Sequence, residues 1–153
     1  MSAEDNLKKL GITLPQVSIP AANFVPFRLH HDTLYVSGQG PRLPSGGFSK
    51  GIVGRDVDID SAYQDARTAG LGLLAVARHA LGTLDRIEFT VKLLGMVNAE
   101  PGFSGQPKVI NGCSDLFVEI LGDAGRHARS AVGMGSLPNN MTVEIEAIFA
   151  VRS

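Results

Sequence analysis

The order and patterning of apolar residues predict an α+β protein, built from a mixed sheet with two helices packed on one face. Two short apolar runs come first, followed by a helical pattern, a third strand, a second helical pattern and two closing strands. The third strand alternates between apolar and polar residues, and each helical pattern has one apolar face. Helices on one side of a sheet bury both kinds of apolar face together.

The chain of 153 residues suits one compact domain. We therefore expect a single domain over residues 1–153, in which 1–19 form an N-terminal helix and an irregular extension. The helix is predicted over Ser2–Leu10, with Ser2 as a candidate N-cap and Gly11 at its end.

Caps, breakers and strand alternation predict the remaining elements. Asp60-Ser61 is expected to open the first long helix, with Gln64 completing a capping box and Gly82 ending the helix. Pro107 stands at the favoured first position of the second helix, which ends at Gly122. The predicted strands are Phe24–Leu29 and Thr33–Ser37 around a turn at 30–32, then Ile87–Val97, and finally Ala128–Ser136 and Met141–Val151, joined by residues 137–140.

Composition argues against several classes of function. The net charge is −1, no basic run occurs and Trp is absent, so neither an electrostatic surface nor stacking platforms for nucleic acid are expected. The single cysteine, Cys113, precludes an intrachain disulfide, and the histidines lack a zinc-ligand spacing. The N-terminus lacks a signal-peptide pattern and no apolar run reaches membrane length, so we expect a soluble, cytoplasmic protein with no membrane partner.

Arg129 is the first candidate for a functional side chain. It stands among small and apolar residues in the segment 127–132, where a charge is costly unless it is paired or used. An arginine can hold a carboxylate through two parallel hydrogen bonds. In a regular strand Ala131 and Gly133 would share its face and leave room for a small organic acid. A structural ion pair is the alternative.

Glu144 and Glu146 are the second candidate. They share one face of the last strand, roughly 7 Å apart at strand rise. A glutamate in apolar surroundings beside a second glutamate is a candidate base with a raised pKa, able to position a water. Two solvated glutamates are the alternative, although the apolar continuation 148–151 argues against full exposure. That continuation also puts apolar residues on both sheet faces, so a partner subunit could cover the second one.

The predicted geometry places these two candidates in different subunits. If the closing strands pair as a hairpin about 138–140, Glu144 lies opposite residue 135 and Arg129 lies roughly 20 Å away along the strand. The two side chains could not then hold one small ligand within one chain. If both serve one site, they come from different subunits of a symmetric oligomer.

Other candidates carry weaker signals. Gly38 and Gly40 in the loop 36–41 allow close backbone approach to a carboxylate or oxyanion, and a plain turn is the alternative. Asn111, near the start of the second helix, could supply a polar contact, and His127 could lie near the site because it precedes Arg129 by two residues. Cys113 lies on the apolar helix face and is expected in the core, not as a nucleophile.

Taken together these residues resemble the Rid/YjgF family, the reactive-intermediate deaminases often labelled endoribonuclease L-PSP-like. The resemblance runs from about Pro20 to the end of the chain, and the N-terminal helix and the loop 101–107 are similar to a longer subfamily. It rests on Val36-Ser37-Gly38-Gln39, on Asn111, and on Ala128-Arg129-Ser130 followed by Leu137-Pro138 and Val143-Glu144-Ile145-Glu146-Ala147-Ile148.

The resemblance implies a chorismate-mutase-like (YjgF-like) fold, a homotrimer with clefts between subunits, and hydrolysis of 2-imino or enamine acids to 2-oxo acids and ammonia. It implies that Arg129 grips the substrate carboxylate and Glu144 positions the attacking water, with no metal or cofactor. The lining residues it implies are Phe24, Ser37, Gly38, Asn111 and Ala131. Phe24 stands where the archetype has a tyrosine, and Ala131 replaces a frequent cysteine.

Two other functions stay open at this point. One is a non-catalytic trimer that binds small carboxylate-bearing metabolites in the same clefts. The other is an endoribonuclease or translation inhibitor, as the family label suggests, against which the near-neutral charge and the lack of a basic stripe argue.

Overall fold

A five-stranded mixed sheet with helices on one face forms the protein, as the sequence predicts. The computed structural model describes all 153 residues, Met1–Ser153. The helices are α1 (Ala3–Lys9), α2 (Ile59–Leu81) and α3 (Gln106–Leu121); the strands are β1 (Phe27–His30), β2 (Thr33–Gln39), β3 (Ile87–Asn98), β4 (Ala128–Met134) and β5 (Val143–Val151); three short 3-10 turns are η1 (Leu84–Arg86), η2 (Gly122–Gly125) and η3 (Pro138–Asn140).

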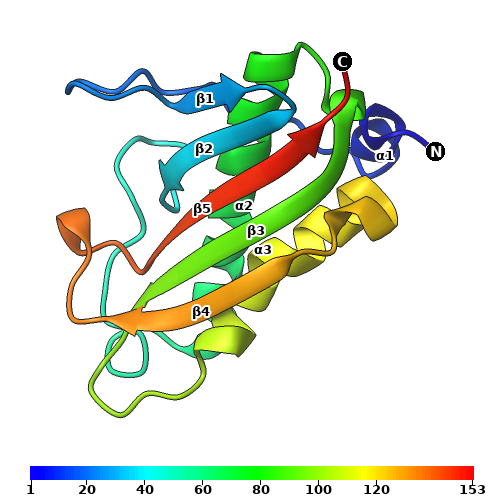
Figure 1. Ribbon diagram of the computed structural model, residues 1–153. Coiled ribbons are helices and arrows are strands. Elements are labelled where there is room, and N and C mark those ends of the chain that lie inside the picture. The colour runs from blue at the N-terminus through cyan, green and yellow to red at the C-terminus, as the bar shows by residue number, and fades with distance from the viewer.

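The strand order is β1-β2-β5-β3-β4, and every neighbouring pair is antiparallel except β3 and β4, which are parallel. Figure 1 shows α2 and α3 behind this sheet, with the other face uncovered. In β5 every second residue, from Val143 to Val151, is buried toward the helices. The main core therefore lies between one sheet face and the two long helices.

None of the three helices is both long and apolar enough to span a lipid bilayer.

Most predicted boundaries shift by a few residues. The first long helix begins at Ile59, because the Asp58 side chain accepts a hydrogen bond from Ser61 N–H at 2.7 Å; the predicted opening at Asp60-Ser61, with its capping box, is wrong. β1 begins at Phe27, so Phe24 lies before the strand and not in it. Pro107 is the second helical residue of α3, after Gln106.

The predicted closing hairpin is also wrong. β4 pairs in parallel with β3 over Lys92–Asn98, and β5 pairs instead with β2 and β3. The helix α3 makes the connection between the parallel strands β3 and β4, which is the ordinary way to join parallel neighbours. The connection 135–142 then leads from the sheet edge back to β5 in the middle.

The uncovered face of the sheet carries apolar side chains, as the pattern of β5 indicates. Ile148 pairs with Tyr35 on β2 and with Lys92 on β3, and Tyr35 is 47% exposed. Phe89 and Val132 are similarly exposed. A sheet face of this composition fits an interaction surface better than a solvated one.

The helix α1, which the two-helix prediction counted with the extension, is a third packed helix. Ser2 is its N-cap, as predicted: Asp5 N–H donates to Ser2 Oγ at 3.1 Å and Ser2 N–H donates to Asp5 Oδ2 at 3.4 Å. Leu7 is buried, and Asn6 donates to the carbonyl oxygen of Ile120 at the end of α3.

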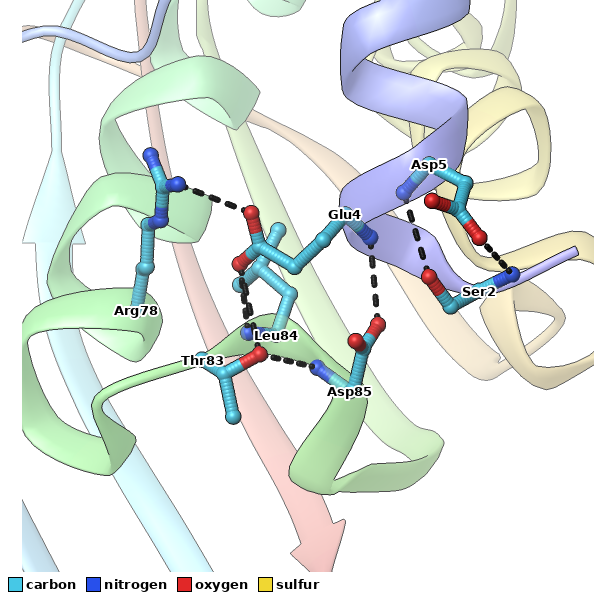
Figure 2. A network of polar contacts seen from close by, with 7 residues as sticks. All are labelled: Ser2, Glu4, Asp5, Arg78, Thr83, Leu84 and Asp85. Atoms are coloured by element: carbon cyan, nitrogen blue, oxygen red, sulfur yellow. Dashed lines mark hydrogen bonds and ion pairs between the residues drawn. The ribbon is translucent and has the colours of Figure 1, made fainter.

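Glu4 and Asp85 join α1 to the turn η1, as Figure 2 shows. The side chain of Glu4 accepts from a backbone N–H group of η1, and the side chain of Asp85 accepts from a backbone N–H group of α1. Glu4 Oε1 accepts from Leu84 N–H at 2.9 Å, and Glu4 Oε2 accepts from the Arg78 guanidinium at 2.8 Å. In return Asp85 Oδ1 accepts from Glu4 N–H at 3.1 Å, and the Thr83 hydroxyl caps Asp85 N–H. This network fixes the N-terminal helix to the end of α2 and the start of β3.

We expect Glu4→Gln to lower the free energy of unfolding by about 1–2 kcal/mol, because the hydrogen bonds at Leu84 and Arg78 lose their anionic acceptor. The ion-pair share is small, since the Arg78 side chain is 47% exposed. Urea denaturation measures the change. Glu88→Gln, at an exposed position of β3, is the matched control and should change little. Equal effects of the two substitutions would contradict the role given to the network.

Candidate functional site

An open groove runs along α3 beside the start of β4. It has a volume of about 700 Å³ and is lined by Tyr63, Asn111, Ser114, Asp115, Val118, Glu119, Arg126, His127 and Arg129. The edge strand β4 leaves this side of the sheet without a further strand. The groove therefore combines an exposed strand edge with a wall of polar helix side chains.

Arg129 lies half-buried in this groove and its charge has no carboxylate partner. Its Nη1 donates to Asn111 Oδ1 at 2.9 Å and to Ser114 Oγ at 3.1 Å. Both acceptors are neutral and lie one turn apart on α3. Arg129 takes part in no ion pair, in contrast to Arg67 and Arg126. The guanidinium is held in place while its remaining N–H groups stay free, which is the state required for binding an acid.

His127 extends this hydrogen-bond system away from Arg129. Its Nε2 lies 2.9 Å from Ser114 Oγ, and its Nδ1 lies 2.6 Å from the carbonyl oxygen of Gly125. A carbonyl oxygen can only accept, so Nδ1 carries the proton and donates to it. Burial lowers the pKa of His127, the hydrogen bond to Gly125 opposes this, and the Arg129 charge lowers the pKa further. The net effect favours the neutral ring. His127 lines the same groove as Arg129.

The acidic residues of the groove are engaged by α2. The Tyr63 hydroxyl donates to Asp115 Oδ2 at 2.7 Å, and this hydrogen bond raises the pKa of Tyr63. Arg67 holds the Glu119 carboxylate with two guanidinium nitrogens at 3.2 Å. Both carboxylates thus have donors other than Arg129.

Glu144 lies on the other face of the sheet, packed over the backbone of β2. A Cβ atom added at Gly38 would come within 2.7 Å of a Glu144 carboxylate oxygen, so the glycine leaves the space that this carboxylate occupies. Burial raises the pKa of Glu144, and the neighbouring charge of Glu146 raises it further. Glu146 itself is exposed. The prediction of one half-buried glutamate with a raised pKa is confirmed for Glu144.

Ser37 precedes Gly38 and holds the segment that follows Phe24. The Ser37 hydroxyl donates to the Val25 carbonyl oxygen at 2.7 Å, and Ser37 N–H donates to that of Pro26 at 2.9 Å. These bonds fix the segment 24–26, which precedes β1, and Phe24 in this segment is 58% exposed. The Ser37 hydroxyl is therefore already used in holding this segment.

Arg129 and Glu144 face opposite sides of one sheet. Arg129 pairs with the buried Leu93 of β3 and reaches α3, whereas Glu144 pairs with Met96 and alternates with buried residues of β5. Their backbones are also separated by two strand spacings across the sheet and by three residues along the strands, which is about 10 Å in each direction. The inference that one chain cannot bring them together stands, for a different reason: the strands do not form the expected hairpin, and the side chains point apart.

The structure therefore divides the predicted residues into two groups. Asn111 and Arg129 meet on the helix side, with Ala131 two residues along β4 on the same face. Glu144 meets Gly38 on the other side, beside Ser37. Phe24 is exposed in the segment before β1, and no contact joins it to Glu144. Sequence reasoning missed Ser114, whose spacing of three residues from Asn111 is the signal that could have found it. Cys113 is fully buried, as expected. No group of three or more His, Cys, Asp or Glu side chains is placed to hold a metal ion.

Comparisons with known proteins agree on the family. A family model described as "YjgF/chorismate mutase-like, putative endoribonuclease" matches residues 4–150. Protein TCP17 of Trypanosoma cruzi is 40% identical over 144 residues, covering 94% of this chain and 90% of that protein.

Two solved structures are similar over nearly their full length. Atu1372 of Agrobacterium tumefaciens is 46% identical with a TM-score of 0.90, covering 98% of this chain and 92% of that one. A structure from Shewanella oneidensis described as "a putative endoribonuclease" is 31% identical with a TM-score of 0.93, covering 99% of this chain and all of that one. With the family model matched over almost the whole sequence, the chain belongs to the YjgF family, as its motifs predicted.

Proposed function

We propose that this protein is a hydrolytic deaminase that converts 2-imino and enamine acids to 2-oxo acids and ammonia, in clefts between the subunits of a homotrimer. The observation that carries the proposal is the Arg129 guanidinium, which is held by two neutral acceptors and has no carboxylate partner. Such a group favours a ligand with a carboxylate. The family resemblance supplies the reaction class, and the arrangement of Glu144 fits it.

The reaction needs orientation and charge placement more than strong chemistry. Arg129 binds the substrate carboxylate through two parallel hydrogen bonds, next to Asn111. Glu144 of a second subunit accepts a proton from water as the oxygen bonds to the imine carbon and the carbon–nitrogen π pair moves to nitrogen. The nitrogen takes this proton from Glu144 and then the proton of the new hydroxyl group. The carbon–nitrogen bond breaks with release of ammonia while the carbon–oxygen double bond forms, and Glu144 is left deprotonated. The cleft is proposed between copies because Arg129 and Glu144 lie on opposite faces of one sheet.

The uncovered sheet face supports the oligomer. It carries the exposed side chains of Tyr35, Phe89 and Val132, and Glu144 lies on it. Burial of this face against a second copy would remove apolar surface from water and bring Glu144 into a subunit interface.

Two other functions are less well supported. A purely binding protein would need Arg129 but would have no use for a carboxylate with a raised pKa. RNA cleavage, which the descriptions of relatives suggest, finds little support in a chain of net charge −1.

We expect Arg129→Ala to reduce kcat/KM for 2-imino acids about 100-fold, because two charge-assisted hydrogen bonds to the substrate are lost. An amino acid oxidase generates the imine, and release of the oxo acid above the spontaneous rate is followed. Arg55→Ala removes an exposed arginine whose side chain is paired with Asp56, outside the groove, and is the matched control. If the wild-type protein does not accelerate the hydrolysis of any imine, the deaminase proposal fails and the non-catalytic binding function is favoured.

The pH dependence should report the Glu144 carboxylate. The base must be deprotonated, so kcat falls as the pH falls through its raised pKa. Glu144→Gln should abolish this acid limb and lower kcat with little change in KM. Glu146→Gln removes the smaller of the two causes that raise the pKa of Glu144, so the limb should move to lower pH with activity retained. A limb unmoved by either substitution contradicts the assignment.

Mixing the two impaired variants tests whether one cleft uses two chains. Arg129→Ala and Glu144→Gln trimers each retain only low activity, but after subunit exchange about a quarter of the clefts receive both intact side chains. Recovery of activity on mixing, with a trimer mass by light scattering, supports shared clefts. No recovery despite exchange shown by mass spectrometry, or a stable monomer at micromolar concentration, would rule them out.

A further inference from the structure

We propose that Ser114 and His127 are positioning residues for Arg129, so that carboxylate binding by this chain depends on a directed chain of hydrogen bonds between α3 and η2. The inference deepens the proposed function and rests on Arg129 as the group that binds the substrate acid. Neither Ser114 nor His127 is assigned a role by the motifs that define the family resemblance.

The direction of each hydrogen bond follows from what its atoms can do. Gly125 O only accepts, so His127 Nδ1 donates and Nε2 keeps a lone pair. Arg129 Nη1 only donates, so Ser114 Oγ accepts from it at 3.1 Å. The Ser114 hydroxyl hydrogen is then free to donate to His127 Nε2 at 2.9 Å. All donors and acceptors of the chain are matched only in this direction.

This series of hydrogen bonds determines which N–H groups of Arg129 are free to bind a ligand. Asn111 and Ser114 occupy both hydrogens of Nη1, and His127 fixes the Ser114 hydroxyl that faces the guanidinium. The other terminal nitrogen and Nε are left for a carboxylate. A long arginine side chain loses much rotational freedom when it binds, and holding it beforehand removes part of that cost.

Protonation of His127 would reverse this order. Nε2 would then become a donor, and Ser114 would face two cationic donors. Phe117, packed edge-on against the ring, brings no charge. The charged and titratable groups that line the groove together with His127 are Arg129, Arg126, Asp115, Glu119 and Tyr63. Burial and the Arg129 charge lower the pKa of the ring, which preserves the neutral form.

The first test is the protonation state of the His127 ring. In protein labelled with ¹⁵N in histidine, the ring nitrogens should show a neutral tautomer at pH 7 with the proton on Nδ1, the opposite of the tautomer that dominates for free histidine. His127→Gln assigns the signals by their loss. A ring protonated on Nε2, or charged at pH 7, overturns the proposal.

The second test separates positioning from folding by comparing pyruvate, which has the carboxylate, with pyruvamide, which lacks it. We expect Ser114→Ala and His127→Phe to weaken pyruvate binding about tenfold in NMR titrations and to leave pyruvamide binding unchanged. Ser114→Thr keeps the hydroxyl and should bind pyruvate as the wild type does. Ser45→Ala, in an exposed loop, is the matched control.

The outcomes distinguish this inference from the deaminase proposal. Pyruvate binding that requires Arg129 and Ser114, in a protein that hydrolyses no imine, supports the positioning chain and rejects the deaminase. An active deaminase whose Ser114→Ala variant binds pyruvate normally, or loses pyruvate and pyruvamide equally, rejects the positioning chain alone. Equal binding of pyruvate by wild type and Arg129→Ala rejects both.

Discussion

The parallel pairing of β4 with β3 determines where the Arg129 side chain points. Because α3 connects these two strands, it packs beside β4 and brings Asn111 and Ser114 within hydrogen-bond distance of Arg129. The strand β5 lies on the other side of β3, and its alternation sends Glu144 to the opposite face. A shift of one residue in the β3–β4 register would turn Arg129 away from α3, so the register determines the geometry of the candidate site as well as the pairing of the sheet.

The sequence predicts local features well where the physical cause lies within a few residues of the feature. Ser2 caps α1 because its hydroxyl satisfies a free N–H group. The alternation predicted along β3 fails between residues 87 and 92, because register shifts there leave Phe89 and Val91 exposed and bury Thr90. The raised pKa of Glu144 follows from an apolar strand with a second carboxylate nearby. Asp58 was missed as a helix cap because Asp60 two residues later is an equally good candidate, and propensity alone cannot separate them.

The sequence predicts long-range pairing less well, because β4 could pair with more than one strand. Neighbouring strands in sequence usually pair, and this general tendency favoured a hairpin with β5. The strand–helix–strand segment 87–134 competes with it as a crossover unit, and burial of α3 against the sheet favours the crossover. Ser114 was missed for the same reason: a serine on an amphipathic helix is unremarkable until the strand facing it is known. Its role depends on the pairing and not on its neighbours in sequence.

Arg129 stays available for a ligand because the acidic residues of the groove are bound by donors on α2. A carboxylate that bonded directly to Arg129 would compete with any substrate acid, and a substrate would have to break that ion pair before it could bind. Asp115 follows Ser114 directly and lines the same groove, but its carboxylate accepts from the Tyr63 hydroxyl. Neutral Oγ and Oδ1 atoms orient the guanidinium without cancelling its charge. The contact between α2 and α3 thus contributes to the site as well as to the core, because it determines which partner Asp115 takes.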